Sequence, residues 1–219
     1  RCTPTDEGHF APTGSTAQTQ CSPGTVAPNA SMGACVSCAA GKYLDEPGKL
    51  ECKPCEAGSF CPAGAAAALP CEEGSHSRAT NLTSAAECTP TAPGFYAPTG
   101  STQPVACSPG TVAPNASMGQ CKSCDPGKFM NQSGATACFA CELGFFCGPG
   151  ASSQLPCSPG SFGNVTGLTT TEACHACPEG HYCDGPGVPV GCDAGSYAEL
   201  GSPSCSLCLP GTYSNALSE

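Results

Sequence analysis

The stretch Cys21-Ser-Pro-Gly-Thr-Val-Ala-Pro-Asn-Ala-Ser-Met-Gly33 recurs without change as Cys107 to Gly119, 86 residues further along the chain. The same offset carries every cysteine between positions 2 and 88 onto a cysteine between 88 and 174, with no gap. A shortened third copy follows, in which Cys192, Cys205 and Cys208 are the repeated cysteines. Internal repeats of this kind decide the architecture of a chain. We expect long cysteine-rich repeats at 1–87 and 88–173 and a partial third at 174–219, in an array that continues beyond this fragment.

A shorter signature lies inside each long repeat: Cys-x-x-Gly-x followed by an aromatic residue or valine, as in Cys38-x-x-Gly41-x-Tyr43. Glycine supplies a backbone conformation closed to other residues, and a preceding Pro or Asp favours a turn. The aromatic residue then begins an extended segment. The signature predicts small repeats of turns and short β-hairpins, with little or no helix beyond one turn within 80–87, stacked into an elongated rod.

The composition excludes a large apolar core. Of the 219 residues, Leu, Val and Phe together number 26, and there is no Trp. Such chains are either disordered or stabilised by something other than apolar burial, and 22 cysteines are typical of a disulfide scaffold. The net charge of −10 argues against nucleic acid as a partner. The longest apolar run, Ala65 to Leu69, is too short for a membrane segment.

Six Cys-x-x-Cys pairs allow three interpretations. Cys35, Cys38, Cys52 and Cys55 approach the spacing of a four-thiolate zinc site, and the same spacing recurs 86 residues later. Cys-x-x-Cys is also the motif of thioredoxin-type redox enzymes, which require a strand–helix context that is missing here. Structural disulfides are the third interpretation. We favour them, because zinc leaves Cys61 and Cys71 without a role; the sequence therefore predicts no metal, no cofactor and no catalytic residue.

Asparagine points independently to the secretory route. Five of the six Asn residues open an Asn-x-Ser/Thr acceptor sequence for N-linked glycans: Asn29, Asn81, Asn115, Asn131 and Asn164. Asn29 and Asn115 occupy the same position of the long repeat. The chain is therefore expected to be secreted and extracellular, at a cell surface, and to carry N-linked glycans.

A local disulfide scheme follows if each Cys-x-x-Gly cysteine bonds forward to the next unclaimed one. It leaves Cys2 and Cys208 over, and an interlaced alternative with 55–71 and 61–88 stays open. The pairs of the local scheme are Cys21–Cys35, Cys38–Cys52, Cys55–Cys61, Cys71–Cys88, Cys107–Cys121, Cys124–Cys138, Cys141–Cys147, Cys157–Cys174, Cys177–Cys183 and Cys192–Cys205.

The segments Cys52-Lys-Pro-Cys-Glu-Ala-Gly-Ser-Phe-Cys61 and Cys174-His-Ala-Cys-Pro-Glu-Gly-His-Tyr-Cys183 resemble the ephrin-receptor-like cysteine-rich repeat, a relative of the EGF-like and TNF-receptor modules. The resemblance covers essentially the whole chain. It implies an extracellular, elongated, non-enzymatic disulfide rod. Tandem arrays of such repeats occur in surface proteins of algae and other protists, including flagellar hair (mastigoneme) proteins.

Two function classes follow. The first is an extracellular structural protein, a glycosylated stalk or filament component of the cell surface or flagellar hairs, whose partners are copies of itself or other surface and filament proteins. The alternative is a receptor or adhesion ectodomain that binds a protein ligand, for which one repeat should differ and expose anchor residues. In an algal or plant-like source, some Pro, Ser and Thr residues would also carry O-glycans.

Overall fold

A computed structural model describes residues 1–215 of the chain as a succession of short antiparallel hairpins. Twelve two-stranded sheets and two single turns of 3-10 helix, η1 (Ala85–Glu87) and η2 (Thr171–Ala173), make up its regular structure. Each strand is two residues long, and the first strand of every hairpin pairs with the strand that follows it in sequence. The expectation of disulfide-rich hairpins with little helix is therefore confirmed.

The first strands of the hairpins are β1 (His9–Phe10), β3 (Thr25–Val26), β5 (Lys42–Tyr43), β7 (Ser59–Phe60), β9 (Ser75–His76), β11 (Phe95–Tyr96), β13 (Thr111–Val112), β15 (Lys128–Phe129), β17 (Phe145–Phe146), β19 (Ser161–Phe162), β21 (His181–Tyr182) and β23 (Ser196–Tyr197). The second strands are β2 (Thr19–Gln20), β4 (Val36–Ser37), β6 (Lys53–Pro54), β8 (Leu69–Pro70), β10 (Thr89–Pro90), β12 (Val105–Ala106), β14 (Lys122–Ser123), β16 (Phe139–Ala140), β18 (Leu155–Pro156), β20 (His175–Ala176), β22 (Val190–Gly191) and β24 (Ser206–Leu207).

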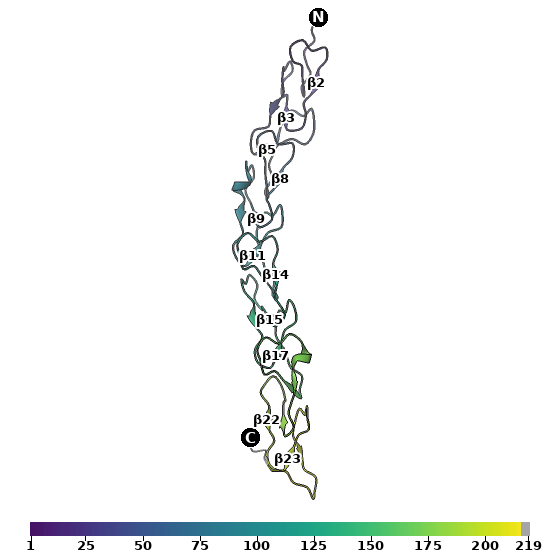
Figure 1. Ribbon diagram of the computed structural model, residues 1–219. Coiled ribbons are helices and arrows are strands. Elements are labelled where there is room, and N and C mark those ends of the chain that lie inside the picture. Colours follow the sequence, from purple (N-terminus) through teal and green to yellow (C-terminus); the bar gives the residue numbers. More distant parts are fainter. Residues whose placement is uncertain (216–219) are drawn as a thin grey trace. The chain divides into compact units, whose positions relative to one another are not determined.

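The hairpins belong to two compact units. One comprises Arg1–Val105 with Asn115–Gln120, and the other comprises Ala106–Pro114 with Cys121–Glu219. Within each unit the labelled strands succeed one another in chain order, as Figure 1 shows for β2, β3, β5 and β8 and for β15, β17, β22 and β23. The division of the sequence into long repeats at 87/88 and 173/174 stays a prediction.

A tight turn leads into each first strand. At β3, Thr25 N–H donates to Ser22 O, the Thr25 hydroxyl donates to the same carbonyl at 2.8 Å, and Gly24 lies in the left-handed region with φ of +81°. A side chain at this φ costs about 1–2 kcal/mol. The glycine of the Cys-x-x-Gly signature is therefore required by the backbone of the turn.

The same glycine also joins neighbouring hairpins. Gly24 N–H donates to Leu44 O of the next hairpin at 2.7 Å, and Gly64 N–H, in the loop of the hairpin after that, donates to Cys38 O at 2.8 Å. A Cβ built on Gly24 would overlap the Gly64 carbonyl oxygen. Each hairpin of the unit thus contacts the next hairpin and the one after it. In the second unit, Gly110 has the same relations to Met130 and Gly150.

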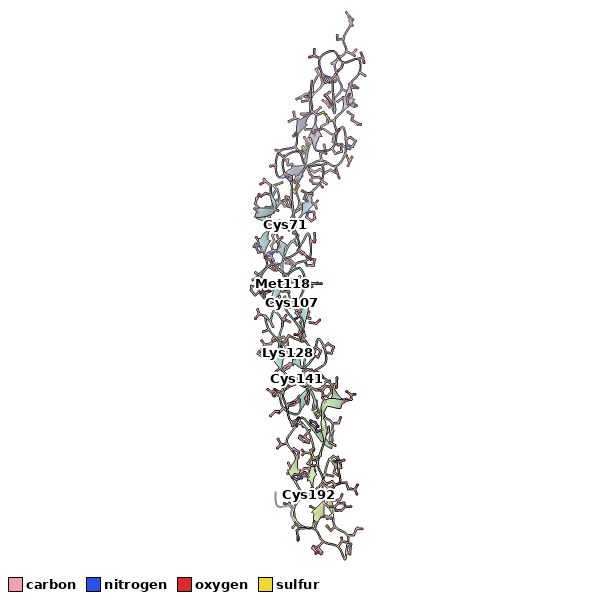
Figure 2. The ribbon with its side chains drawn as sticks, in the orientation of Figure 1. Cys71, Cys107, Met118, Lys128, Cys141 and Cys192 are labelled. Carbon is pink, nitrogen blue, oxygen red and sulfur yellow. A yellow bond between two sulfur atoms is a disulfide. The ribbon has the colours of Figure 1, made fainter. Side chains whose placement is uncertain are left out.

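The apolar interior is divided into small clusters, each built around a disulfide. Val26, Cys38 and Leu44 form one cluster with Cys52 packed against it. Phe60 packs on another, made of Cys71, Cys88 and Leu82, and Leu82 also forms a parallel bridge with Phe60. Each cluster draws its members from adjacent hairpins. The sulfur atoms and one or two aliphatic side chains therefore take the place of a continuous core (Figure 2, in which Cys71, Cys107, Cys141 and Cys192 are labelled).

Two repeat positions carry threonine where other hairpins have a buried half-cystine. Thr91 N–H donates to Gly74 O at 2.9 Å, just as Cys71 N–H donates to Gly58 O. Thr91 is 1% exposed. Thr5, its counterpart 86 residues earlier, is also buried. Within residues 1–215, neither hydroxyl oxygen has a hydrogen-bond partner.

We expect Thr91→Val to stabilise the protein by about 1 kcal/mol, because valine keeps the branched shape and removes a buried hydroxyl that nothing satisfies. Urea unfolding measures the change. Thr89→Val at an exposed position of β10 is the matched control and should change stability little. A lower unfolding free energy for Thr91→Val would contradict the expectation.

Candidate functional site

The disulfides are the first set of sequence-predicted residues to place. The structure forms ten: Cys21–Cys35, Cys38–Cys52, Cys55–Cys61, Cys71–Cys88, Cys107–Cys121, Cys124–Cys138, Cys141–Cys147, Cys157–Cys174, Cys177–Cys183 and Cys192–Cys205. These are the pairs of the local scheme, and the interlaced pairs 55–71 and 61–88 do not form.

No Cys-x-x-Cys pair is bonded to itself, and in five of the six pairs the two cysteines belong to different cross-links. Cys35 bonds to Cys21, whereas Cys38 bonds to Cys52 and Cys55 to Cys61. A zinc site needs free thiolates, and a thioredoxin-type centre needs its two cysteines to bond to each other. Here these cysteines are instead bonded to partners outside their own Cys-x-x-Cys pair. Cys2 and Cys208 form no disulfide within residues 1–215; Cys2 is exposed, and Cys208 Sγ lies 3.4 Å from Ser214 Oγ.

All five acceptor asparagines are exposed, and each lies in the loop between the two strands of a hairpin: Asn29, Asn81, Asn115, Asn131 and Asn164. Their backbones differ. In the two identical copies the acceptor serines, Ser31 and Ser117, are left-handed with φ of +64° and +58°. In the β9–β10 loop Asn81 itself has φ of +61°. Non-glycine residues seldom adopt this conformation, so each of these loops carries some backbone strain within its acceptor sequence.

Glu87 organises the loop that contains Asn81. Its carboxylate accepts hydrogen bonds from the backbone N–H groups of Thr83 and Ser84, at 2.9 and 3.2 Å, and from the Thr83 hydroxyl. Thr83 is the hydroxyl residue of the Asn81 acceptor sequence. The hydrogen bond from the Thr83 hydroxyl, followed by those from the two N–H groups, holds the pKa of Glu87 below its ordinary value.

Acid should therefore loosen the Asn81 loop. Because the folded-state pKa of Glu87 is lowered, its contribution is complete at neutral pH and is lost as the pH falls through that pKa, which lies below the ordinary value of a glutamate. We expect the amide hydrogens of Thr83 and Ser84 to lose protection from exchange in acid, beyond the intrinsic pH effect. In Glu87→Gln the protection should be weaker at neutral pH and nearly independent of pH. A wild-type loop that shows no such loss at any acidic pH at which the protein stays folded would refute the role of Glu87.

A second polar cluster lies on the β5–β6 hairpin of the first unit. Lys53 Nζ lies 2.7 Å from Asp45 Oδ1 and 3.5 Å from Glu46 Oε1, and Lys49 Nζ lies 3.0 Å from Glu46 Oε2. The bond to Lys53 lowers the pKa of Asp45, and the bond to Asp45 raises that of Lys53. All these groups are exposed, so their ion pairs contribute little to stability.

The second copy of the long repeat lacks these charges. Asn131, Gln132, Ala135 and Phe139 stand where the first copy has the four charged residues of the cluster. Phe139 is 59% exposed, and its ring centroid lies 6.4 Å from that of Phe129. A second aromatic pair joins Phe162 to His175 across β19–β20, at 6.0 Å. The sequence patterns gave no role to these pairs or to Glu87.

The four histidines lie on separate hairpins and do not converge. His9 Nδ1 and His181 Nδ1 each lie 3.2 Å from a backbone oxygen two residues earlier. His76 Nδ1 is buried without a partner among residues 1–215. In the same part of the chain, no three His, Cys, Asp or Glu side chains group in a way that would hold a metal. A surface hollow of about 580 Å³ is lined by residues between Arg1 and Gln18.

Comparison with models of protein families gives no match to this chain, and comparison with curated proteins gives none either. Over residues 1–215, no helix has the length and apolar character needed to cross a bilayer. The arrangement therefore offers cross-links, exposed glycan acceptors and repeated surfaces as its candidate functional features.

Proposed function

We propose that this chain is an extracellular structural protein, a glycosylated, disulfide-stapled component of a cell-surface stalk or filament. The observation that carries the proposal is the repetition of one contact set from hairpin to hairpin within each unit. A turn glycine N–H donates to the next hairpin, and a loop N–H donates back to a half-cystine, as Gly41 and Gly64 do in the first unit and Gly127 and Gly150 in the second. A structure that grows by adding identical steps suits a stalk or filament.

The cross-links support an oxidising environment. Each of the ten disulfides has at least one buried half-cystine, and disulfides persist in secreted and cell-surface proteins but are rare in reducing compartments. Five exposed acceptor asparagines agree with the same route. The resemblance to ephrin-receptor-like repeats supports a finer proposal, in which the chain is a surface or flagellar hair protein of the mastigoneme type and its partners are copies of itself or other filament proteins.

A receptor or adhesion ectodomain is the second candidate, and one observation favours it. In the second copy Phe139 and Leu143 replace Lys53 and Ala57 of the first, and both are more than half exposed. Binding sites often use such exposed apolar anchors on one repeat only. Under this hypothesis a soluble protein ligand contacts the β15–β16 hairpin and the turn that follows it.

Electron microscopy of the native material, labelled with an antibody to this chain, separates the two functions. The structural proposal predicts label at regular intervals along filaments or stalks. Label only on isolated monomers that bind one soluble protein partner, with the binding lost in Phe139→Lys, would instead establish the receptor function. Sedimentation of the secreted chain at rising concentration adds a second test, since a filament component should self-associate and a monomeric receptor should not.

A further inference from the structure

Two hairpins of the second unit share an arrangement that involves a glycan acceptor. Phe129 and Phe139 are directly opposite each other in the β15–β16 register, and Phe162 and His175 are opposite each other in β19–β20. In each hairpin an acceptor asparagine stands two residues after the first-strand aromatic: Asn131 after Phe129, and Asn164 after Phe162. These are the two aromatic pairs found among residues 1–215.

The first unit shows where a side chain at the acceptor position reaches. In the β5–β6 hairpin, Asp45 stands two residues after Tyr43, and Lys53 is opposite Tyr43 in the register. The side chains of Asp45 and Lys53 meet at 2.7 Å. By the 86-residue offset, Asn131 and Phe139 occupy these two positions, in a loop of the same length. A group attached to Asn131 therefore starts beside the ring of Phe139.

The aromatic pairs present apolar surface that the protein leaves uncovered. Phe139 is 59% exposed, His175 is exposed, and both asparagines are exposed. An N-acetylglucosamine ring has an apolar face of C–H groups and an acetyl methyl group. Placing that face on an aromatic ring removes apolar area from water and brings C–H groups to the electron-rich face of the ring.

We propose that the first N-acetylglucosamine of the glycan on Asn131 packs against the Phe129–Phe139 pair. Attachment joins the side-chain amide nitrogen to the anomeric carbon of the sugar, and the diphosphate of a polyprenyl-linked oligosaccharide donor leaves as the amide loses a proton. The inference rests on the secretory location in the proposed function. It makes the Asn131 glycan part of the packing of its own hairpin.

Two other acceptors, Asn29 and Asn115, provide internal controls. Asn29 and Asn115 stand three residues after Val26 and Val112, which are opposite Val36 and Lys122. Neither hairpin has an aromatic side chain on which a sugar could stack. Glycans at Asn29 and Asn115 are therefore expected to extend into solvent without stabilising the hairpins that carry them.

Hydrogen exchange of the β15–β16 hairpin tests the proposal on the secreted chain, with its glycans trimmed to a single N-acetylglucosamine. Exchange is compared in the wild type, Asn131→Gln, Phe139→Ser and the double variant. We expect Asn131→Gln to accelerate hydrogen exchange of residues 128–140 about fivefold. This factor corresponds to the loss of the free energy of one ordinary aromatic contact. In the Phe139→Ser background the same change should have less than about a twofold effect. Asn115→Gln should also change exchange in its own hairpin by less than about twofold.

Two further measurements distinguish sugar packing from a general effect of glycosylation. The acetyl methyl resonance of the sugar on Asn131 should be shifted upfield by the ring and return to the value of a solvated sugar in Phe139→Ser. In the first unit, Asp45→Asn with Pro47→Ser creates an acceptor, and adding Lys53→Phe should make its glycan protective. The inference would be overturned if Asn131→Gln and Asn115→Gln had equal effects on exchange, or if the effects of Asn131→Gln and Phe139→Ser were additive. An unshifted methyl resonance or an Asn131 that carries no glycan would also overturn it. Filament labelling by microscopy is scored separately, so failure of sugar packing leaves the structural function standing.

Discussion

Gly24→Ala is expected to lower the free energy of unfolding by about 2–5 kcal/mol. Gly24 has φ of +81°, where an alanine costs about 1–2 kcal/mol. The added Cβ would also overlap the carbonyl oxygen of Gly64, a backbone atom that cannot move aside alone. Relief requires the loop two hairpins away to shift and weakens the bond from Gly64 N–H to Cys38 O. Overpacking of this kind costs a further 1–3 kcal/mol or so.

Gly14→Ala is the matched control, because Gly14 has the same φ of +81° and no atom lies within 4 Å of the Cβ position. It should cost only the backbone strain, about 1–2 kcal/mol. Urea unfolding of both variants measures the two contributions, and the yield of secreted protein gives an independent ranking. Equal losses for Gly14→Ala and Gly24→Ala would mean that the contact with the second hairpin contributes nothing.

Removal of the Cys38–Cys52 disulfide, by Cys38→Ala with Cys52→Ala, should cost about 3 kcal/mol or more. The bond spans a sequence separation of 14, and loops of this size are worth about 3 kcal/mol in the chain-entropy model. Cys38 and Cys52 also pack against Val26 and Leu44, and removal of the two sulfur atoms would leave these side chains partly uncovered. The loss should extend to the preceding hairpin, because Val26 belongs to β3.

The Cys55–Cys61 bond is the control for loop length, because its cysteines are only six residues apart. Its removal should cost a little over 2 kcal/mol by the same model. Hydrogen exchange should show opening confined to fewer residues in this variant than in Cys38→Ala with Cys52→Ala. An equal extent of opening would show that the length of the closed loop does not determine how far the loss of a disulfide spreads.

The local features of the fold were predictable from the sequence. The spacing Cys38-x-x-Gly41-x-Tyr43 specifies a turn and the start of a strand, since only glycine adopts the required φ readily. The pairing of Cys38 with Cys52 follows from bonding each signature cysteine forward. The pairs 55–61 and 71–88 needed the structure, because a sequence separation of six and one of 16 are both compatible with disulfide geometry.

Contacts between hairpins were not predictable, because no local pattern encodes them. The carbonyl of Gly64 beside Gly24 arises from the meshing of hairpins that are not adjacent in sequence. The ion pair of Asp45 with Lys53 depends on the register of β5 and β6 and on the side-chain directions that it sets. The acceptor asparagines were recognisable as sequence motifs. The inference that Asn131 stands beside Phe139 needed the contact between Asp45 and Lys53 at the corresponding positions of the first copy.

Within a unit, each hairpin contacts the next hairpin and the one after it. Changes in the number of hairpins should therefore differ in their effect on folding, depending on how many hairpins are gained or lost. Inserting or deleting one hairpin replaces partners at two positions on each side of the junction, as at Gly24 and Gly64. Unequal recombination between tandem copies, in register over the 86-residue block, places every hairpin beside partners that it already had. A lineage could therefore lengthen or shorten such a protein in a single genetic event without a folding defect at the new junction.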